Sequence, residues 1–233
     1  MSEAEVHKRM IRHVAGALGP ELLGKVAFVG GCTTGLLITD DFSREQVRHT
    51  KDVDLIIHVV GYAEWAEVQN QLRSKGFKDI LSGDAPICAL QLGELRVDFM
   101  PDDARLLGFS NRWYSQALST AEPYAIGDDI VIRLVTPPYF VATKLEAYSG
   151  RGNNDPLGSQ DVEDILNLCD GREALVNEMA QAPADLRNYV SSALRRLLEH
   201  PSMDHAIQSC ARGNVEQEKY LYGVIDSIVA LGA

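Results

Sequence analysis

One apolar run, residues 55–60, constrains the fold more than any other stretch of the sequence. Its Leu-Ile-Ile-His-Val-Val puts apolar side chains on both faces of an extended chain, which is typical of a strand at the centre of its sheet. Asp52 and Asp54 open the run, and side chains two apart in a strand point to the same face. Two negative charges about 4 Å apart repel by roughly 4 kcal/mol at an effective dielectric of about 20, so such a pair usually holds a cation. The stretch therefore predicts a metal site.

Helices and strands alternate up to residue 135. The apolar spacing and the turn residues predict strands at 25–29, 53–60, 77–81, 87–92, 95–100 and 130–134, and helices at 3–18, 33–38, 62–75 and 111–119. Gly19-Pro20 is expected to stop the first helix, and Ser110 to cap the last one. Turns are expected at residues 82–84 (Ser-Gly-Asp) and, as a tight hairpin, at Gly93-Glu94.

Only helical patterns follow from Thr136 onward. Thr136 is a good N-cap and Pro137 suits the first helical position, so the domain boundary is expected here. Helices are predicted at 138–149, 159–169, 172–181, 184–199, 203–212 and 215–231. The sequence thus predicts an α/β (α+β) fold, with a small mixed β-sheet domain in residues 1–135 and a helical C-terminal domain in residues 136–233.

Composition excludes several classes of protein. The chain has 233 residues and a formal net charge of -11, which disfavours a broad basic surface for duplex DNA. The N-terminus lacks the apolar core of a signal peptide, and no run reaches the roughly 18 apolar residues that span a bilayer, so we expect a cytoplasmic protein without membrane contact. The cysteines show no paired spacing and the histidines no ligand spacing, which predicts neither a zinc site nor a disulfide framework. His58, inside the apolar run, is expected in the core.

A third carboxylate, Asp98, lies on the polar face of the predicted strand 95–100. If this strand neighbours the one that begins at Asp52, then Asp98 joins Asp52 and Asp54 around the same ion. Three carboxylates fit Mg²⁺, which prefers oxygen ligands, and two metal ions about 3.5 to 4 Å apart can clamp the attacking and leaving oxygens of a phosphoryl transfer. A two-metal Mg²⁺ site that handles a nucleoside triphosphate is the resulting hypothesis.

Two further segments suit a triphosphate. Gly30-Gly31 ends a predicted strand, and backbone without side chains, followed by the amides of a helix start near Thr33, can approach a polyphosphate. Further along the chain, one helix face is expected to carry Lys144, Tyr148 and Arg151, which are spaced i, i+4 and i+7. This face is a candidate to point at the phosphates.

Taken in chain order, four groups of residues form a recognisable set. They are Val29-Gly30-Gly31; Arg48-x-Thr50-x-Asp52-x-Asp54; Arg96-Val97-Asp98; and Lys144-x-x-Ala147-Tyr148-x-x-Arg151 followed by Asp161-x-x-Asp164. The set resembles the motifs of the nucleotidyltransferase superfamily related to DNA polymerase β, and its last group is similar to the AbiEii/AbiGii toxin-type branch. The resemblance covers roughly residues 26–170.

The resemblance implies a polymerase β-like fold and an activity. A nucleoside monophosphate would pass from an NTP to a hydroxyl, with Mg²⁺ as cofactor and pyrophosphate as the leaving group. The metal-holding and catalytic roles fall on Asp52, Asp54 and Asp98. The nucleotide-binding roles fall on Gly30, Gly31, Thr33, Lys144, Tyr148, Arg151, Asp161 and Asp164.

Several alternatives stay open at the level of sequence. The acceptor is RNA such as tRNA, or a protein, in a toxin-like enzyme with a cognate antitoxin, and a small alcohol such as an aminoglycoside in an antibiotic-modifying one. A different class is a catalytically silent module that binds an NTP or a partner on the same fold. In purely structural terms, Gly30-Gly31 is a turn, Asp52 and Asp54 are a solvated strand start, and Lys144 with Asp161 and Asp164 is an interhelical salt-bridge set.

Overall fold

The computed structural model describes residues 2–80, 86–108, 110–127 and 129–232. The chain divides into two compact units, each described below by itself: Met1–Thr33 with His49–Thr136, and Thr34–Arg48 with Pro137–Ala233. The predicted α/β class is confirmed, because the first unit holds a mixed sheet and the second is helical. The expected division at residue 136 did not anticipate that Thr34–Arg48 packs with the C-terminal helices.

A mixed sheet forms the centre of the first unit. In the described part of the chain its order is β3-β4-β5-β2-β1-β7-β6. The strands are β1 (Val26–Val29), β2 (Asp52–Ile57), β3 (Lys78–Asp79), β4 (Ala89–Leu92), β5 (Leu95–Pro101), β6 (Glu122–Ala125) and β7 (Val131–Leu134). β2 is central as predicted, with β5 parallel on one side and β1 antiparallel on the other. Its side chains Leu55, Ile56 and Ile57 are buried, although the strand ends at Ile57 and not at Val60 as expected.

The hairpin expected at Gly93-Glu94 is confirmed, since β4 and β5 pair antiparallel with Leu92 opposite Leu95. The turn expected at residues 82–84 lies outside the described residues. β6 was not predicted from sequence, because it contains Pro123 and its side chains are mostly exposed. It lies at the edge of the sheet, where proline is tolerated.

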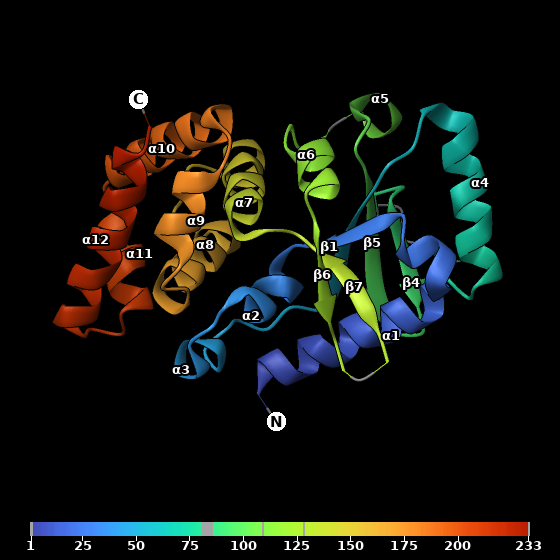
Figure 1. Cartoon of the computed structure of the whole chain (residues 1–233), viewed down its shortest axis with the longest axis horizontal. Helices are drawn as coiled ribbons and strands as arrows, with labels where there is room; N and C mark the ends of the chain where they lie inside the picture. The colour runs from blue at the N-terminus through green and yellow to red at the C-terminus, as the bar shows by residue number, and fades with distance from the viewer. Residues whose placement is uncertain (1, 81–85, 109, 128, 233) are drawn as a thin grey trace. The chain divides into compact units, whose positions relative to one another are not determined.

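The first unit's helices are α1 (Glu3–Leu23), a 3-10 turn (Gly31–Thr33), α4 (Gly61–Ser74), α5 (Ala104–Leu107) and α6 (Tyr114–Ser119). Figure 1 shows α1 lying across the strands and α4 beside the sheet. The stop expected at Gly19-Pro20 is confirmed: Gly19 leaves the helical conformation at φ +67°, and a separate short helical stretch follows it from Pro20 to Leu23 within α1. Ser110 does not cap α6, whose N-cap position is Trp113. His58, expected in the core, is exposed and pairs with Asp102.

The second unit is a bundle of helices, coloured yellow to red in Figure 1, together with an earlier segment in blue. Its helices are α2 (Thr34–Leu37), α3 (Asp41–Arg44), α7 (Pro137–Arg151), α8 (Gln160–Gly171), α9 (Leu175–Gln181), α10 (Ala184–Leu198), α11 (Met203–Cys210) and α12 (Val215–Ala230). Ser159 caps α8 by accepting a hydrogen bond from the Val162 amide. Helices α2 and α3 pack on α8, which is buried along most of its length. Among the described residues, no helix is both long and apolar enough to cross a bilayer.

Candidate metal and nucleotide site

Three carboxylates meet on one face of the sheet in the first unit. The parallel pairing of β2 and β5 sets Asp52 opposite Arg96 and Asp54 opposite Asp98, and side chains two apart share a face. Carboxylate oxygens of Asp52, Asp54 and Asp98 lie within 4.8 Å of one another. β2 and β5 are therefore neighbours in the sheet, which is the condition under which Asp98 was expected to join Asp52 and Asp54.

Gly30 packs directly against the Asp54 carboxylate. Because β1 runs antiparallel to β2, Val29 lies opposite Asp54 and the chain turns at Gly30 beside that carboxylate. Gly30 has φ +76°, and a Cβ atom there would lie 1.9 Å from Asp54 Oδ2. Both the backbone conformation and the space exclude any larger residue.

The glycine turn is closed by its own hydrogen bonds. Thr33 donates to the Gly30 carbonyl from its amide, at 3.1 Å, and from its hydroxyl, at 2.8 Å. Thr33 is buried, and Gly31 begins the 3-10 turn that joins the two. The Thr33 hydroxyl, which the sequence suggested near a phosphate, here stabilises the turn.

Two neighbouring side chains orient the carboxylates. The Thr50 hydroxyl donates to Asp52 Oδ1 at 2.5 Å, and Arg96 donates from Nε and Nη2 to the two oxygens of Asp98 at 2.8 and 2.7 Å. These bonds to Asp98 raise the pKa of the Arg96 guanidinium, with smaller effects from Asp52 and Asp54. Neither role was assigned from sequence, although the i, i+2 spacing of each pair on an extended chain is the signal that would have found it.

The donor set fits a hard divalent cation. An ionised carboxylate offers about four lone-pair sites on its two oxygens, so Asp98 can accept from Arg96 and still ligate an ion. Oxygen donors alone, with no sulfur or imidazole, are the set that Mg²⁺ takes. The geometry can thus hold a cation.

The residues of the last motif group, from Lys144 to Asp164, form a buried ion-pair network in the second unit. Lys144 Nζ lies 2.6 Å from Asp164 Oδ2 and 3.1 Å from Asp161 Oδ1, and its side chain is 7% exposed. Arg151 also binds Asp161, at 3.1 Å, and Arg48 binds Asp164, at 3.2 Å. Burial alone would raise the pKa of Asp161, but Lys144 and Arg151 outweigh it and lower that pKa.

The structure therefore shows Lys144 in a set of salt bridges, as in the structural alternative given from sequence. These salt bridges are buried and do not lie on the surface. Among the predicted nucleotide-binding side chains of this unit, Arg151 is the exposed one, at 72% of its side chain. Tyr148 lies on the same helix and lines a separate hollow of about 240 Å³ together with Tyr189 and Arg196.

A second candidate ligand group, missed from sequence, joins Glu3, His7 and His49 in the first unit. His49 Nδ1 lies 2.7 Å from Glu3 Oε2, and His7 Nε2 accepts a hydrogen bond from the Thr50 amide at 3.2 Å. An ion on the other ring nitrogen of His7 would require a proton on Nε2, facing the Thr50 N–H. This clash argues that the cluster anchors the Thr50 segment and does not hold a metal.

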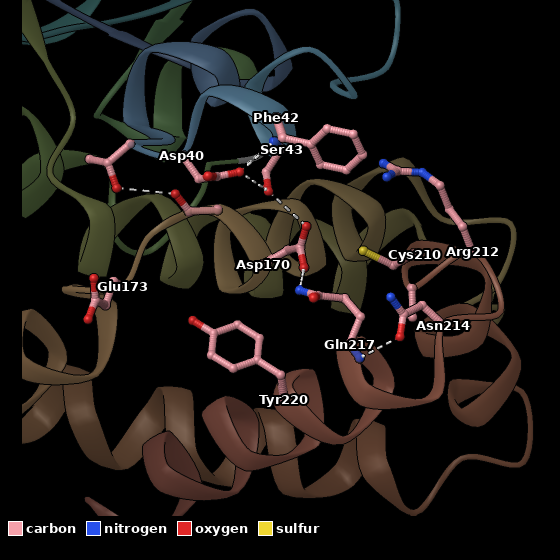
Figure 2. A pocket seen from close by; sticks show the side chains of 13 residues that line it. Asp40, Phe42, Ser43, Asp170, Glu173, Cys210, Arg212, Asn214, Gln217 and Tyr220 are labelled. Atoms are coloured by element: carbon pink, nitrogen blue, oxygen red, sulfur yellow. Dashed lines mark hydrogen bonds between the residues drawn. The ribbon is translucent and has the colours of Figure 1, made fainter.

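Figure 2 shows a hollow of about 810 Å³ in the second unit, lined by α8, α11, α12 and the α3 segment. A chain of hydrogen bonds joins its polar groups: Ser43 donates to Asp170 at 3.0 Å and Gln217 donates to the other oxygen of Asp170. Burial, together with Asp170, raises the pKa of the Cys210 thiol to about 12. Its thiol therefore stays protonated, and the hollow offers no activated nucleophile.

The comparisons with known proteins add no family to these observations. No family model matches the sequence, and no match is found among the curated proteins.

Proposed function

We propose that the protein is a Mg²⁺-dependent nucleotidyltransferase that moves an NMP from an NTP to a hydroxyl and releases pyrophosphate. One observation carries the proposal: the carboxylates of Asp52, Asp54 and Asp98 gather within 4.8 Å on adjacent parallel strands. Three like charges kept together on a rigid sheet oppose one another unless a cation joins them. The glycine turn supports the same reading, since the absence of a side chain at Gly30 leaves the space that the Asp54 carboxylate occupies.

The proposed roles follow from the contacts. When bound, Mg²⁺ would neutralise charge on the triphosphate and activate the acceptor hydroxyl. Asp52, oriented by Thr50, and Asp54, backed by Gly30, hold the metal. Asp98, oriented by Arg96, completes the ligand set and accepts or orients the acceptor proton. The backbone of Gly30 and Gly31 approaches the phosphates.

In the second unit, Arg151 is proposed as a phosphate-binding residue, because its guanidinium is exposed. Lys144 is proposed to act with it through their shared partner Asp161, while Asp164 ties Lys144 to Arg48. Tyr148, one turn from Lys144 on α7, is proposed to contact the nucleotide. The acceptor stays within the classes named from sequence, RNA or protein with a cognate antitoxin, or a small molecule.

The test is transfer of label from α-labelled NTP. The wild-type protein is incubated with Mg²⁺, each NTP, and total RNA or cell lysate, and labelled products are resolved by size. Asp52→Asn plus Asp54→Asn should abolish transfer, while Asp226→Asn, an exposed aspartate on α12, should leave it unchanged. Transfer by the double variant at the wild-type rate would refute the proposal.

A silent binding module is the second candidate, and one observation favours it. Lys144, the lysine expected on the triphosphate, is buried and already paired with two aspartates. Calorimetry with NTP separates the two candidates. Metal-independent binding without turnover supports the silent module, whereas binding that requires Mg²⁺ and is followed by pyrophosphate release supports the enzyme.

A further inference from the structure

The segment just before Asp52, a proposed metal ligand, is not held by the sheet. In the described part of the chain, β2 pairs with β5 from Asp52 onward and with β1 from Asp54 to Ile57. Thr50 precedes this ladder, yet it is buried, at 6% exposure. Because a buried backbone amide needs an acceptor, the partner of the Thr50 N–H must come from outside the sheet.

That partner is the side chain of His7, near the start of α1. The Thr50 N–H donates to His7 Nε2 at 3.2 Å, and His7 is 1% exposed. Because Nε2 accepts this hydrogen bond, the ring is neutral and carries its proton on Nδ1. A buried imidazole of the helix thus fixes the backbone that leads into β2.

The backbone of Thr50 in turn sets the direction of its hydroxyl. Threonine is β-branched and stiff at χ1, so a fixed backbone leaves Oγ1 little freedom. This hydroxyl donates to Asp52 Oδ1 at 2.5 Å. Two hydrogen bonds therefore connect His7 to Asp52 through one residue, and hydrogen-bonded partners of this kind orient the ligands of metal sites.

A second contact between α1 and the same segment lies at the surface. His49 Nδ1 is 2.7 Å from Glu3 Oε2, and these side chains are 53% and 41% exposed. Glu3 and His7 are four residues apart on α1, so both face the segment from one side of the helix. Because solvent weakens the outer pair, the buried bond to His7 is the stronger constraint on Thr50.

We propose that His7 is a positioning residue of the metal site, which holds the Thr50 hydroxyl on Asp52 by accepting from the Thr50 amide. The inference rests on the metal site of the proposed function. The position requires a buried neutral acceptor and not an imidazole as such. Glutamine can supply an acceptor oxygen close to the place of Nε2, whereas leucine fills the space without one.

Calorimetric titration of the full chain with Mg²⁺ tests the effect on the site. His7→Leu and Thr50→Val should each weaken Mg²⁺ binding about tenfold or more, as loss of an orienting partner does. His7→Gln should bind nearly as the wild type does. His13→Leu, the same change as His7→Leu at an exposed position of α1, should bind as the wild type does.

A double variant tests whether His7 acts through Thr50. His7→Leu plus Thr50→Val should bind Mg²⁺ no more weakly than Thr50→Val alone, because both changes remove the same hydroxyl contact. Hydrogen exchange of the Thr50 amide, followed by NMR in a chelator, gives a readout without metal. Exchange should be about tenfold faster or more in His7→Leu and should keep its wild-type rate in His7→Gln.

Equal Mg²⁺ binding by His7→Leu and the wild type, or additive losses in the double variant, would overturn the proposal and leave the nucleotidyltransferase assignment standing. If the wild type does not bind Mg²⁺, the metal site itself is refuted, and this inference with it. If His7→Leu does not fold, Thr50→Val decides, since an unchanged affinity there would show that the Thr50 hydroxyl does not orient Asp52.

Discussion

On β2 and β5 the carboxylates of Asp52, Asp54 and Asp98 gather within 4.8 Å of one another, whereas between α7 and α8 each aspartate faces a lysine or an arginine. The first cluster has an excess of negative charge, with Arg96 as its neighbouring cation. The second cluster alternates its charges, and all its members except Arg151 are buried or nearly so. A buried network of alternating charge holds the fold together, while a cluster of one sign is kept at a cost to stability and needs a ligand.

The comparison yields opposite expectations for mutations. Removing a charge from the α7–α8 network should destabilise the fold, because the buried groups that remain have fewer opposite charges around them. Removing a charge from the β2–β5 cluster should leave the fold as stable or more so. An equal change in the free energy of unfolding after charge removal in the two clusters would contradict this distinction between them.

The largest expected effect is that of Lys144→Met. The change leaves the buried Asp161 with Arg151, and the buried Asp164 with Arg48, as the remaining cations. Removing one partner of a buried pair costs about 3–5 kcal/mol, which is an upper bound here because these cations remain. Urea unfolding of the two proteins measures the difference. Lys219→Met serves as control, since Lys219 forms an exposed pair with Glu216, and it should unfold as the wild type does. A loss for Lys144→Met as small as that of the control would show that the network is not structural.

Next in size is Gly30→Ala. A left-handed conformation costs a residue with a Cβ about 1–2 kcal/mol, and the new atom would also push the Asp54 carboxylate aside. Gly61→Ala isolates the second effect, because Gly61 has φ +79° and nothing within 4 Å of a Cβ. Both variants should lose stability, but only Gly30→Ala should lose metal binding by calorimetry. Loss of binding in both, or in neither, would contradict the role given to Gly30.

A smaller effect, of opposite sign, is expected from Asp52→Asn plus Asp54→Asn in the absence of metal. Relief of like-charge repulsion should raise the free energy of unfolding by roughly 1 kcal/mol, since Arg96 and solvent offset most of the repulsion. Urea unfolding in the presence of a chelator measures it. A loss of more than about 1 kcal/mol would place these carboxylates among the structural charges.

The smallest effect concerns the pair of His58 and Asp102 at 2.8 Å, in which the His58 side chain is 64% exposed and that of Asp102 is 6% exposed. The hydrogen bond to Asp102 raises the pKa of His58, so protonated His58 stabilises the fold. That contribution is fully present below the unfolded pKa of about 6.5 and is lost as pH rises through the higher folded value. This contribution of His58 to stability is under about 1 kcal/mol, because solvent screens the exposed imidazole. The stability gap between wild type and His58→Gln should therefore be larger at acidic than at alkaline pH, and a gap that widens with pH would contradict this.

Much of the fold could be predicted from local sequence patterns. The central strand, the hairpin at Gly93-Glu94 and the helices after Pro137 follow from alternation, turn residues and helical periodicity. Edge strand β6 could not be predicted from local patterns, because Pro123 and exposed side chains give no strand pattern. His58 was wrongly placed in the core, since the apolar run gave no sign that β2 ends one residue earlier.

For the site, spacing placed Asp52 and Asp54 on one face of a strand, whereas Asp98 joins them only because β2 and β5 are neighbours, which the sequence stated as a condition. Their partners depended on tertiary structure: the pairing of Lys144 with Asp164 requires the packing of α7 on α8, which no local pattern encodes. The same holds for Thr34–Arg48, whose short helices contain no sequence signal for packing on α8. The sequence offered Lys144 with Asp161 and Asp164 as one alternative, a salt-bridge set, but it did not identify Arg151 and Arg48 as further partners of these aspartates.

The central claim is that the β2–β5 carboxylates form a divalent-cation site. Calorimetric titration with Mg²⁺, and with Mn²⁺ as a probe, tests it in the wild-type protein and in Asp52→Asn plus Asp54→Asn. We expect saturable binding in the wild type, a rise in melting temperature with metal concentration, and loss of both in the double variant. Equal binding by the two proteins, or none by either, would contradict the claim.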